Sequence, residues 1–280
     1  MALTEQPRRL AATIGAATDQ GPRDQQKDAA AVHTTRDGDV GAVLVDGFSE
    51  RLGEEPVFRA TAELAAWVAA KHDALAGLIA AQEVIHIAGR TAGTDDLLGP
   101  DCVGAIVSIR RDGSADATWT GDCRVYTWRR ADKQLTLHTR DHTEGARMRE
   151  RIAAEPELAE SWADPADFDH EVTTTMQWAS IPEHHHREVP IGRRAIAGWV
   201  PLPTCDMVLI TCDGVHDTMP HEDLQRVVTG HADQDPAAIA QALITAARAA
   251  DAQHDDPDER VDDNATAVVV KLAATTTGGI

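Results

Sequence analysis

Val208-Leu209-Ile210-Thr211-Cys212-Asp213-Gly214-Val215-His216-Asp217 is the stretch of this sequence that best predicts its fold. Met207 to Ile210 is a short apolar run, which is typical of a buried β-strand. Asp213 follows the strand, and Gly214 allows the backbone to turn sharply there. A carboxylate at the end of a buried strand is costly unless a cation lies beside it. We therefore expect a metal ion near Asp213 and further carboxylates around it.

The composition favours a globular protein and narrows the range of its partners. The 280 residues suffice for one large domain or two small ones, and 42% of them are apolar. The formal net charge is −20, from 46 acidic and 26 basic residues. Such acidity excludes the basic footprint of a nucleic-acid-binding protein and disfavours an anionic membrane as partner. No signal peptide or membrane-spanning run is visible, so we expect a cytoplasmic protein.

The four cysteines, Cys102, Cys123, Cys205 and Cys212, form no Cys-x-x-Cys pair. Because two of them lie in or beside apolar runs, we expect buried, reduced thiols. Residues 184–186 are three consecutive histidines. Adjacent histidines cannot all face one ion, and no second Cys/His cluster completes such a site, which favours an exposed loop over a zinc site.

Apolar periodicity predicts strands first and helices in two separate blocks. The expected strands are 10–15, 29–34, 41–45, 103–109, 115–120, 125–129, 134–139, 207–210 and 265–272. The expected helices are two within 56–88, one over 145–160, one from about His221 and one capped by Asp235 with Pro236 at its first position. Such an order predicts an α+β sandwich.

Two finer expectations concern packing. The four strands between 103 and 139 are joined by short turns, which favours antiparallel pairing in one meander. Leu64, Trp67 and Val68 fall at helical spacing and predict a stripe that packs in the core rather than a cofactor site. Residues 145–200 are less regular and form an excursion from this pattern.

Aspartates mark the ends of several strands. The Asp-Gly pairs at Asp37 and Asp112 lie between polar strand ends and predict hairpin turns. The pairs at Asp46 and Asp213 instead follow apolar strands, and two further aspartates, Asp28 and Asp263, enter strands. Oxygen ligands of this kind select Mg²⁺ or Mn²⁺ over zinc. Periodicity alone leaves open whether the four side chains converge.

Five segments resemble, in order, the motifs of the metal-dependent type 2C (PPM) serine/threonine protein phosphatases, in their bacterial form. They are Arg23-Asp24-Gln25-Gln26-Lys27-Asp28, Val43-Leu44-Val45-Asp46-Gly47, Gly121-Asp122-Cys123-Arg124, Leu209 to Asp217, and Asp263 to Val270. The third is similar to the family's Gly-Asp-Ser-Arg, the fourth to its Asp-Gly-x-x-Asp and the fifth to its Asp-Asn-x-Thr. Each is weak alone, but the five in order cover about residues 10–272.

The resemblance implies an αββα sandwich, in which two antiparallel sheets packed face to face carry helices on both outer faces. It implies one catalytic domain over residues 1–280, with the excursion at 145–200 as a flap beside the cleft. Two divalent ions, Mg²⁺ or Mn²⁺, would lie in that cleft. Their ligands would be Asp46 as the bridge, the Gly47 carbonyl, Asp213, Asp263 and, mainly through water, Asp28.

The implied activity is hydrolysis of phosphoserine and phosphothreonine in proteins. A metal-bridging hydroxide would attack phosphorus in line, while Arg23 grips the phosphate. The partner would be a phosphoprotein, the target of a serine/threonine kinase in a signalling system, and we expect a monomer. A third ion, found in bacterial members, would be held by Asp96, although Asp95 or Asp101 could take that role.

Three departures from the family pattern stand near the expected metal ligands. Many members have histidine after the second Asp-Gly as an acid for the leaving group, and this chain has Phe48. Lys27 stands where an acidic or amide residue is usual, and His216 occupies an often aromatic position where we expect it to pack. A phosphatase-like binding module with weak turnover is therefore the main alternative. A hydrolase of small phosphate esters is a third.

Overall fold

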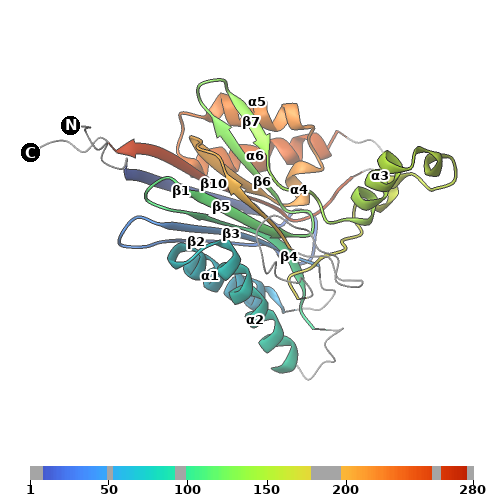
Figure 1. The fold of residues 1–280 in the computed structure, drawn as a ribbon, viewed down its shortest axis with the longest axis horizontal. Coiled ribbons are helices and arrows are strands. Elements are labelled where there is room, and N and C mark those ends of the chain that lie inside the picture. The colour runs from blue at the N-terminus through green and yellow to red at the C-terminus, as the bar shows by residue number, and fades with distance from the viewer. Residues whose placement is uncertain (1–8, 49–52, 92–98, 178–196, 254–259, 276–280) are drawn as a thin grey trace, which may run out of the picture.

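Two antiparallel sheets face one another in the middle of the molecule, and helices cover their outer faces (Figure 1). The computed structural model describes residues 9–48, 53–91, 99–177, 197–253 and 260–275. The first sheet has the order β1 (Arg9–Asp19), β10 (Ala265–Thr275), β9 (Met207–Thr211), β6 (Arg124–Arg129) and β7 (Gln134–Leu137). The second has the order β2 (Ala29–Thr34), β3 (Val40–Gly47), β4 (Cys102–Ile109), β5 (Ala115–Thr120) and β8 (Gly198–Leu202).

The helices divide between the two faces. Helices α1 (Glu55–Lys71) and α2 (Ala74–Thr91) cover the second sheet, and α5 (His221–His231) and α6 (Pro236–Asp251) cover the first (Figure 1). The Asp235 side chain caps α6 by accepting from the Ala237 amide, as predicted. The expected αββα sandwich is confirmed. None of the helices in the described ranges has the length and apolar character needed to cross a bilayer.

Strand β3 shows how the sequence builds two cores from one strand. Its side chains alternate between faces, as in any strand. Ala42 and Leu44 belong to the core between the sheets, whereas Val43 and Val45 belong to the core under α1 and α2. Because both faces are covered, the strand reads as a continuous apolar run that ends at Asp46.

The predicted packing of the Trp67 stripe is wrong. Trp67 is 42% exposed and Leu64 is 40% exposed, and the Lys71 ammonium lies 3.7 Å from the Trp67 ring centre. The buried face of α1 carries Phe58 and a row of alanines instead. Small side chains let the helix backbone approach the sheet closely, so the bulky residues at helical spacing were left on the outside.

The predicted meander is also wrong, because the chain changes sheets between β5 and β6. Gly121 adopts φ +67°, a left-handed conformation that glycine reaches without strain. A Cβ there would lie 2.1 Å from Cγ1 of Val103. A connection of three residues, 121–123, thus crosses from one sheet to the other. The two hairpins on either side, β4–β5 and β6–β7, do pair as expected.

The excursion at 145–200 is partly regular. Helix α3 (Glu144–Ala154) is followed by two 3₁₀ turns, η1 (Pro156–Glu160) and η2 (Pro165–Phe168). Strand β8, at the end of the excursion, was not predicted, and it pairs with the edge of β5. The three histidines at 184–186 lie outside the described residues. After the excursion, the short helix α4 (Asp213–His216) follows β9 directly.

Candidate metal centre

Aspartates from both sheets converge at one end of the sandwich. In order they are Asp28 before β2, Asp46 next to the last residue of β3, Asp122 before β6, Asp213 after β9 and Asp263 before β10. All but Asp28 line one pocket of about 590 Å³, together with Gly47 and Asn264. Asp28 is buried behind them. Antiparallel pairing explains the meeting, because the start of one strand lies beside the end of the next.

Asp46 is the centre of the group. One ligand atom each from Asp28, Asp46 and Cys212 lie within 4.8 Å of one another. The same is true of Asp46, Asp122 and Cys123. Asp46 therefore contacts carboxylates on both sides, which is the arrangement that a bridging ligand requires.

The carboxylates repel one another. Burial raises the pKa of Asp46 well above its ordinary value, and the charges of Asp213, Asp28, Asp122 and Asp263 raise it further. The pKa of Asp213 is raised in the same way, by burial and then by Asp122 and Asp263.

The two flanking carboxylates are affected similarly. Burial raises the pKa of Asp28 to about 6, against the lowering effect of hydrogen bonds with Thr266 and Cys212. The pKa of Asp122 rises to about 7 because of burial and the charges of Asp217 and Asp141. Buried acids that repel one another favour a bound cation, and their oxygen donors suit a hard divalent ion. The residues present fit Mg²⁺ or Mn²⁺.

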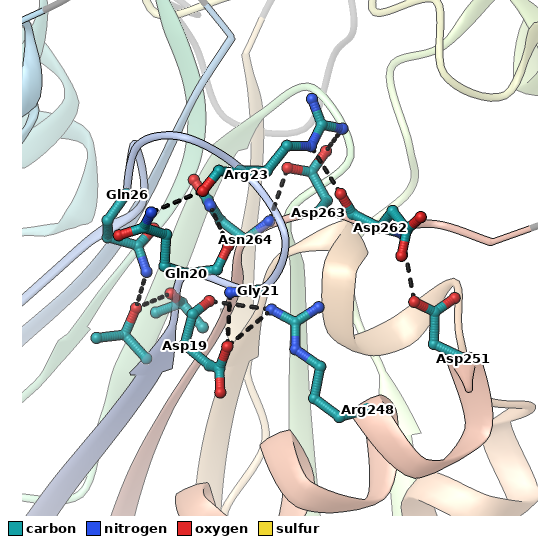
Figure 2. Close-up of polar contacts among 12 residues, drawn as sticks. Asp19, Gln20, Gly21, Arg23, Gln26, Arg248, Asp251, Asp262, Asp263 and Asn264 are labelled. Atoms are coloured by element: carbon teal, nitrogen blue, oxygen red, sulfur yellow. Dashed lines mark hydrogen bonds and ion pairs between the residues drawn. The ribbon is translucent and has the colours of Figure 1, made fainter. Parts of the chain in front are cut away.

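Asn264 holds the loop that leads to Asp28 (Figure 2). Its side-chain amide donates to the carbonyls of Gln20 and Gln25, at 2.8 and 3.0 Å. Its side-chain oxygen accepts from the Lys27 amide at 2.7 Å. Three hydrogen bonds thus tie the loop before β2 to the loop before β10. The two loops bring Asp28 and Asp263 to the same pocket.

Gly214 explains why an Asp-Gly pair ends β9. A Cβ at this position would lie 2.0 Å from the Asn264 carbonyl oxygen. Only glycine therefore lets the turn after Asp213 pack against the loop that carries Asp263. The Gly214 amide donates to the Asp213 carboxylate at 2.6 Å.

Arg23 lines the pocket, but its side chain is engaged (Figure 2). Its Nε donates to the Asp262 carbonyl at 2.7 Å, and one terminal nitrogen pairs with the Asp263 carboxylate at 2.7 Å. Asp262 itself has φ +44°, and Asp251 accepts from the Val261 and Asp262 amides. The guanidinium is half exposed at the mouth of the pocket.

Asp96, the predicted ligand of a third ion, lies outside the described residues, and so does the alternative Asp95. Asp101 is described, and its carboxylate accepts from the amides of Cys102 and Gln177, at 2.8 and 3.1 Å. It therefore fixes the start of β4, and it is absent from the lining of the described pocket.

Among the pocket residues that were not predicted as site residues, Asp122 and His170 bear most on the chemistry. Asp122 lies in the quoted Gly-Asp-Cys-Arg segment, and its position shortly before a strand was the signal. His170 comes from the excursion, just after η2, and no sequence pattern marked it. The neighbouring Asp169 pairs with Arg149, and a bridge between Thr143 and Val172 holds the segment.

Two of the three departures from the motif pattern reach the pocket. Phe48 lines it with 47% of its surface exposed, and Lys27 lines it beside Asp263. His216 packs inside the protein, as predicted, with Nδ1 2.8 Å from the Thr211 hydroxyl. The four cysteines are free, and three of them are buried.

Comparisons with known proteins agree with this architecture. No protein-family model matches the sequence, and a search of curated proteins finds no match. Among solved structures, the S. agalactiae serine/threonine phosphatase is 17% identical, with a TM-score of 0.69 over 93% of this chain and 99% of that one. The catalytic domain of the phosphatase PstP, crystallised with two manganese ions, is 20% identical, with a TM-score of 0.64 over 94% and 99%.

A third match is the PPM Ser-Thr phosphatase MsPP from Mycobacterium smegmatis, in complex with cacodylate. It is 20% identical, with a TM-score of 0.62 over 93% of this chain and 98% of that one. At such identities the likeness establishes the fold. The chain therefore has the αββα fold of bacterial PPM-type serine/threonine phosphatases.

Proposed function

We propose that this chain is a member of the PPM family and a Mg²⁺- or Mn²⁺-dependent phosphatase of phosphoserine and phosphothreonine in proteins. The observation that carries the proposal is the cluster of mutually repelling carboxylates around Asp46, at the end of a sandwich with the PPM fold. The two manganese ions of PstP support the choice of metal. We assign the whole activity to one domain and expect it to act as a monomer in the cytoplasm.

The ligands follow from the positions of the side chains. Asp46 would be a ligand of both ions, because it lies close to Asp28 in one group and to Asp122 in another, and Asp213 and Asp263 would be further ligands from the same pocket. The Gly47 carbonyl and, for a third ion, Asp96 complete the proposed set. When bound, two such ions make a nucleophile available from water near neutral pH and neutralise charge on the phosphoryl oxygens.

Arg23 would bind the substrate phosphate. Its pairing with Asp263 keeps the guanidinium at the mouth of the pocket, and its remaining donors can form a bidentate contact with two phosphate oxygens. Cations bound by Asp263 would weaken that pairing and release the guanidinium for the substrate. Substitution by lysine would keep the charge and lose the planar fork.

His170 would supply the proton that the leaving serine or threonine oxygen needs. Phe48 has no proton to give, and His170 is the imidazole among the described residues that line the pocket. Histidine is the side chain that most often performs general acid catalysis. Its segment is held by the Asp169–Arg149 pair on one side and by the Thr143–Val172 bridge on the other.

The test is phosphate release from a phosphothreonine peptide across a series of divalent cations. We expect activity with Mn²⁺ or Mg²⁺, loss of activity in EDTA, and no activity in Asp213→Asn or Asp46→Asn. Asp112→Asn is the matched control, because Asp112 lies in an exposed hairpin. Full activity of the metal-free protein would refute the proposal. Turnover of small esters alone would assign the chain to the small-ester hydrolases.

The alternative is a phosphatase-like binding module. Two observations favour it, namely Phe48 in the pocket and the engagement of Arg23 by Asp262 and Asp263. A module of this kind would bind a phosphopeptide in the presence of Mn²⁺ without releasing phosphate. Tight phosphopeptide binding, no turnover and no gain in Phe48→His would decide in its favour.

A further inference from the structure

Cys123 and Cys212 lie directly beyond the paired ends of two neighbouring strands. Strands β6 and β9 are antiparallel, and their register pairs Arg124 with Thr211 at the end of the ladder. One step further along that register, Cys123 faces Cys212. Directly opposed residues of an antiparallel pair point to the same side of the sheet, with Cβ atoms about 4.5–5.5 Å apart. The two thiols are therefore neighbours.

Both thiols point into the space between the sheets, toward Asp46. Each cysteine is fully buried and belongs to the core between the two sheets. Each thiol sulfur also lies within 4.8 Å of a carboxylate oxygen of Asp46, on the facing sheet. The Cys212 sulfur donates to Asp28 at 3.3 Å and accepts from the Thr266 amide at 3.0 Å. It also lies 3.6 Å from the Asn264 and Thr266 carbonyl oxygens.

The ligand atoms near the two thiols differ from those of the carboxylate pocket, because they include sulfur as well as oxygen. Sulfur and oxygen ligands around one zinc ion lie about 3.5 Å apart, given Zn–S near 2.3 Å and Zn–O near 2.1 Å. Each sulfur is now within 4.8 Å of an Asp46 oxygen, Cys212 in a group with Asp28 and Cys123 in a group with Asp122, and side-chain rotations toward Asp46 would bring the two groups together around one ion. Two thiolates and two carboxylates make a four-coordinate set, and thiolates select Zn²⁺ or Cd²⁺ over Mg²⁺ and Mn²⁺.

We propose that Cys123, Cys212 and Asp46, with Asp28 or Asp122 as the fourth ligand, form a binding site for a thiophilic divalent cation such as Zn²⁺. The ion enters through the carboxylate pocket, where Asp46 is partly exposed. Binding releases the two thiol protons to the solvent and transfers no electrons. Asp46 would be a ligand in this site and in the carboxylate pocket, so bound Zn²⁺ prevents Mn²⁺ from binding in the pocket. That consequence rests on the proposed phosphatase function, whereas the site itself does not.

The test is a titration of the reduced, metal-free protein with Cd²⁺, followed by the ultraviolet charge-transfer band that cadmium–thiolate bonds produce. We expect the band to reach a plateau at one Cd²⁺ per chain in the wild type. Cys123→Ser and Cys212→Ser should each weaken binding by more than about tenfold, and the double variant should lose the band. Cys205→Ser is the matched control, because Cys205 lies outside the cluster.

Zn²⁺ competition completes the test without requiring enzyme activity. We expect Zn²⁺ to abolish the cadmium band and to displace bound Mn²⁺ from the wild type, and the double variant to retain Mn²⁺ at the same Zn²⁺ concentration. Far-ultraviolet circular dichroism checks that the variants fold. Absence of the band in the wild type, or its persistence in the double variant, would overturn the proposed site. Absence of phosphate release would instead count against the phosphatase proposal alone.

Discussion

Replacing Asp28 by asparagine should stabilise the metal-free protein. Asp28 is buried, and its pKa is raised from 3.8 to about 6. Because one pKa unit corresponds to about 1.4 kcal/mol, the ionised carboxylate makes folding less favourable by about 3 kcal/mol above pH 6. Asparagine has nearly the same shape and can still accept from Cys212, so its substitution removes the charge without leaving a cavity.

The pH dependence has a definite sign. In the unfolded chain Asp28 ionises near its ordinary value, and in the folded chain it holds its proton up to about pH 6. The folded state therefore binds more protons between about pH 4 and pH 6, and wild-type stability falls as the pH rises through that range. The advantage of Asp28→Asn should be full at pH 8 and should shrink toward pH 4.

Thermal unfolding in EDTA measures this difference. A gain of about 3 kcal/mol corresponds to an increase in Tm of roughly 5–10 °C for a chain of this size. Adding Mn²⁺ should reverse the order, because the wild type gains more stability from bound metal than the variant does. Asp112→Asn should change Tm little. A lower Tm of Asp28→Asn in EDTA at pH 8, or a difference that does not depend on pH, would refute the electrostatic reasoning.

Phe48→His should add a second proton donor, in addition to His170, and raise turnover of a phosphothreonine peptide more than that of an aryl phosphate, because only the alkoxide leaving group needs a proton; equal gains would argue against proton donation from position 48. His170→Gln should lower peptide turnover by about 10²-fold and aryl phosphate turnover much less, as measured by kcat, with Mn²⁺ affinity unchanged as the check on folding. Asn264→Ala should cost about 2–4 kcal/mol in urea unfolding, because it leaves the Lys27 amide and two loop carbonyls without their buried partner. The same variant should bind Mn²⁺ more weakly by calorimetry, and unchanged affinity would show that the loop is held by other contacts.

Local chemistry in the sequence was enough to predict most elements of the fold. Strand β2 has the predicted bounds, and the Asp235–Pro236 start of α6 is as expected. These features depend on neighbours in the sequence, namely on alternating side chains, on a capping carboxylate and on the ring of proline. The aspartates at strand ends could be found for the same reason, because each one interrupts or borders an apolar run.

The errors concern which surfaces meet. The Trp67 stripe has the same period as the alanine face beside it, and only the closeness of α1 to β3 decides which of them is buried. The turn at Gly121 looks like any hairpin, and only the position of the second sheet shows that the chain crosses there. Helical period and turn chemistry are local quantities, whereas both outcomes depend on distant segments.

The candidate site divides in the same way. By itself the sequence determined which carboxylates lie at the beginnings and ends of strands. It also determined that their oxygen atoms suit a hard cation. Only the tertiary structure decided that Asp122 and His170 share their pocket, that Asp263 engages Arg23, and that two thiols lie beneath Asp46. The physical reason is that ligand chemistry belongs to each side chain alone, while repulsion, burial and coordination depend on distances of a few ångströms between strands far apart in the chain.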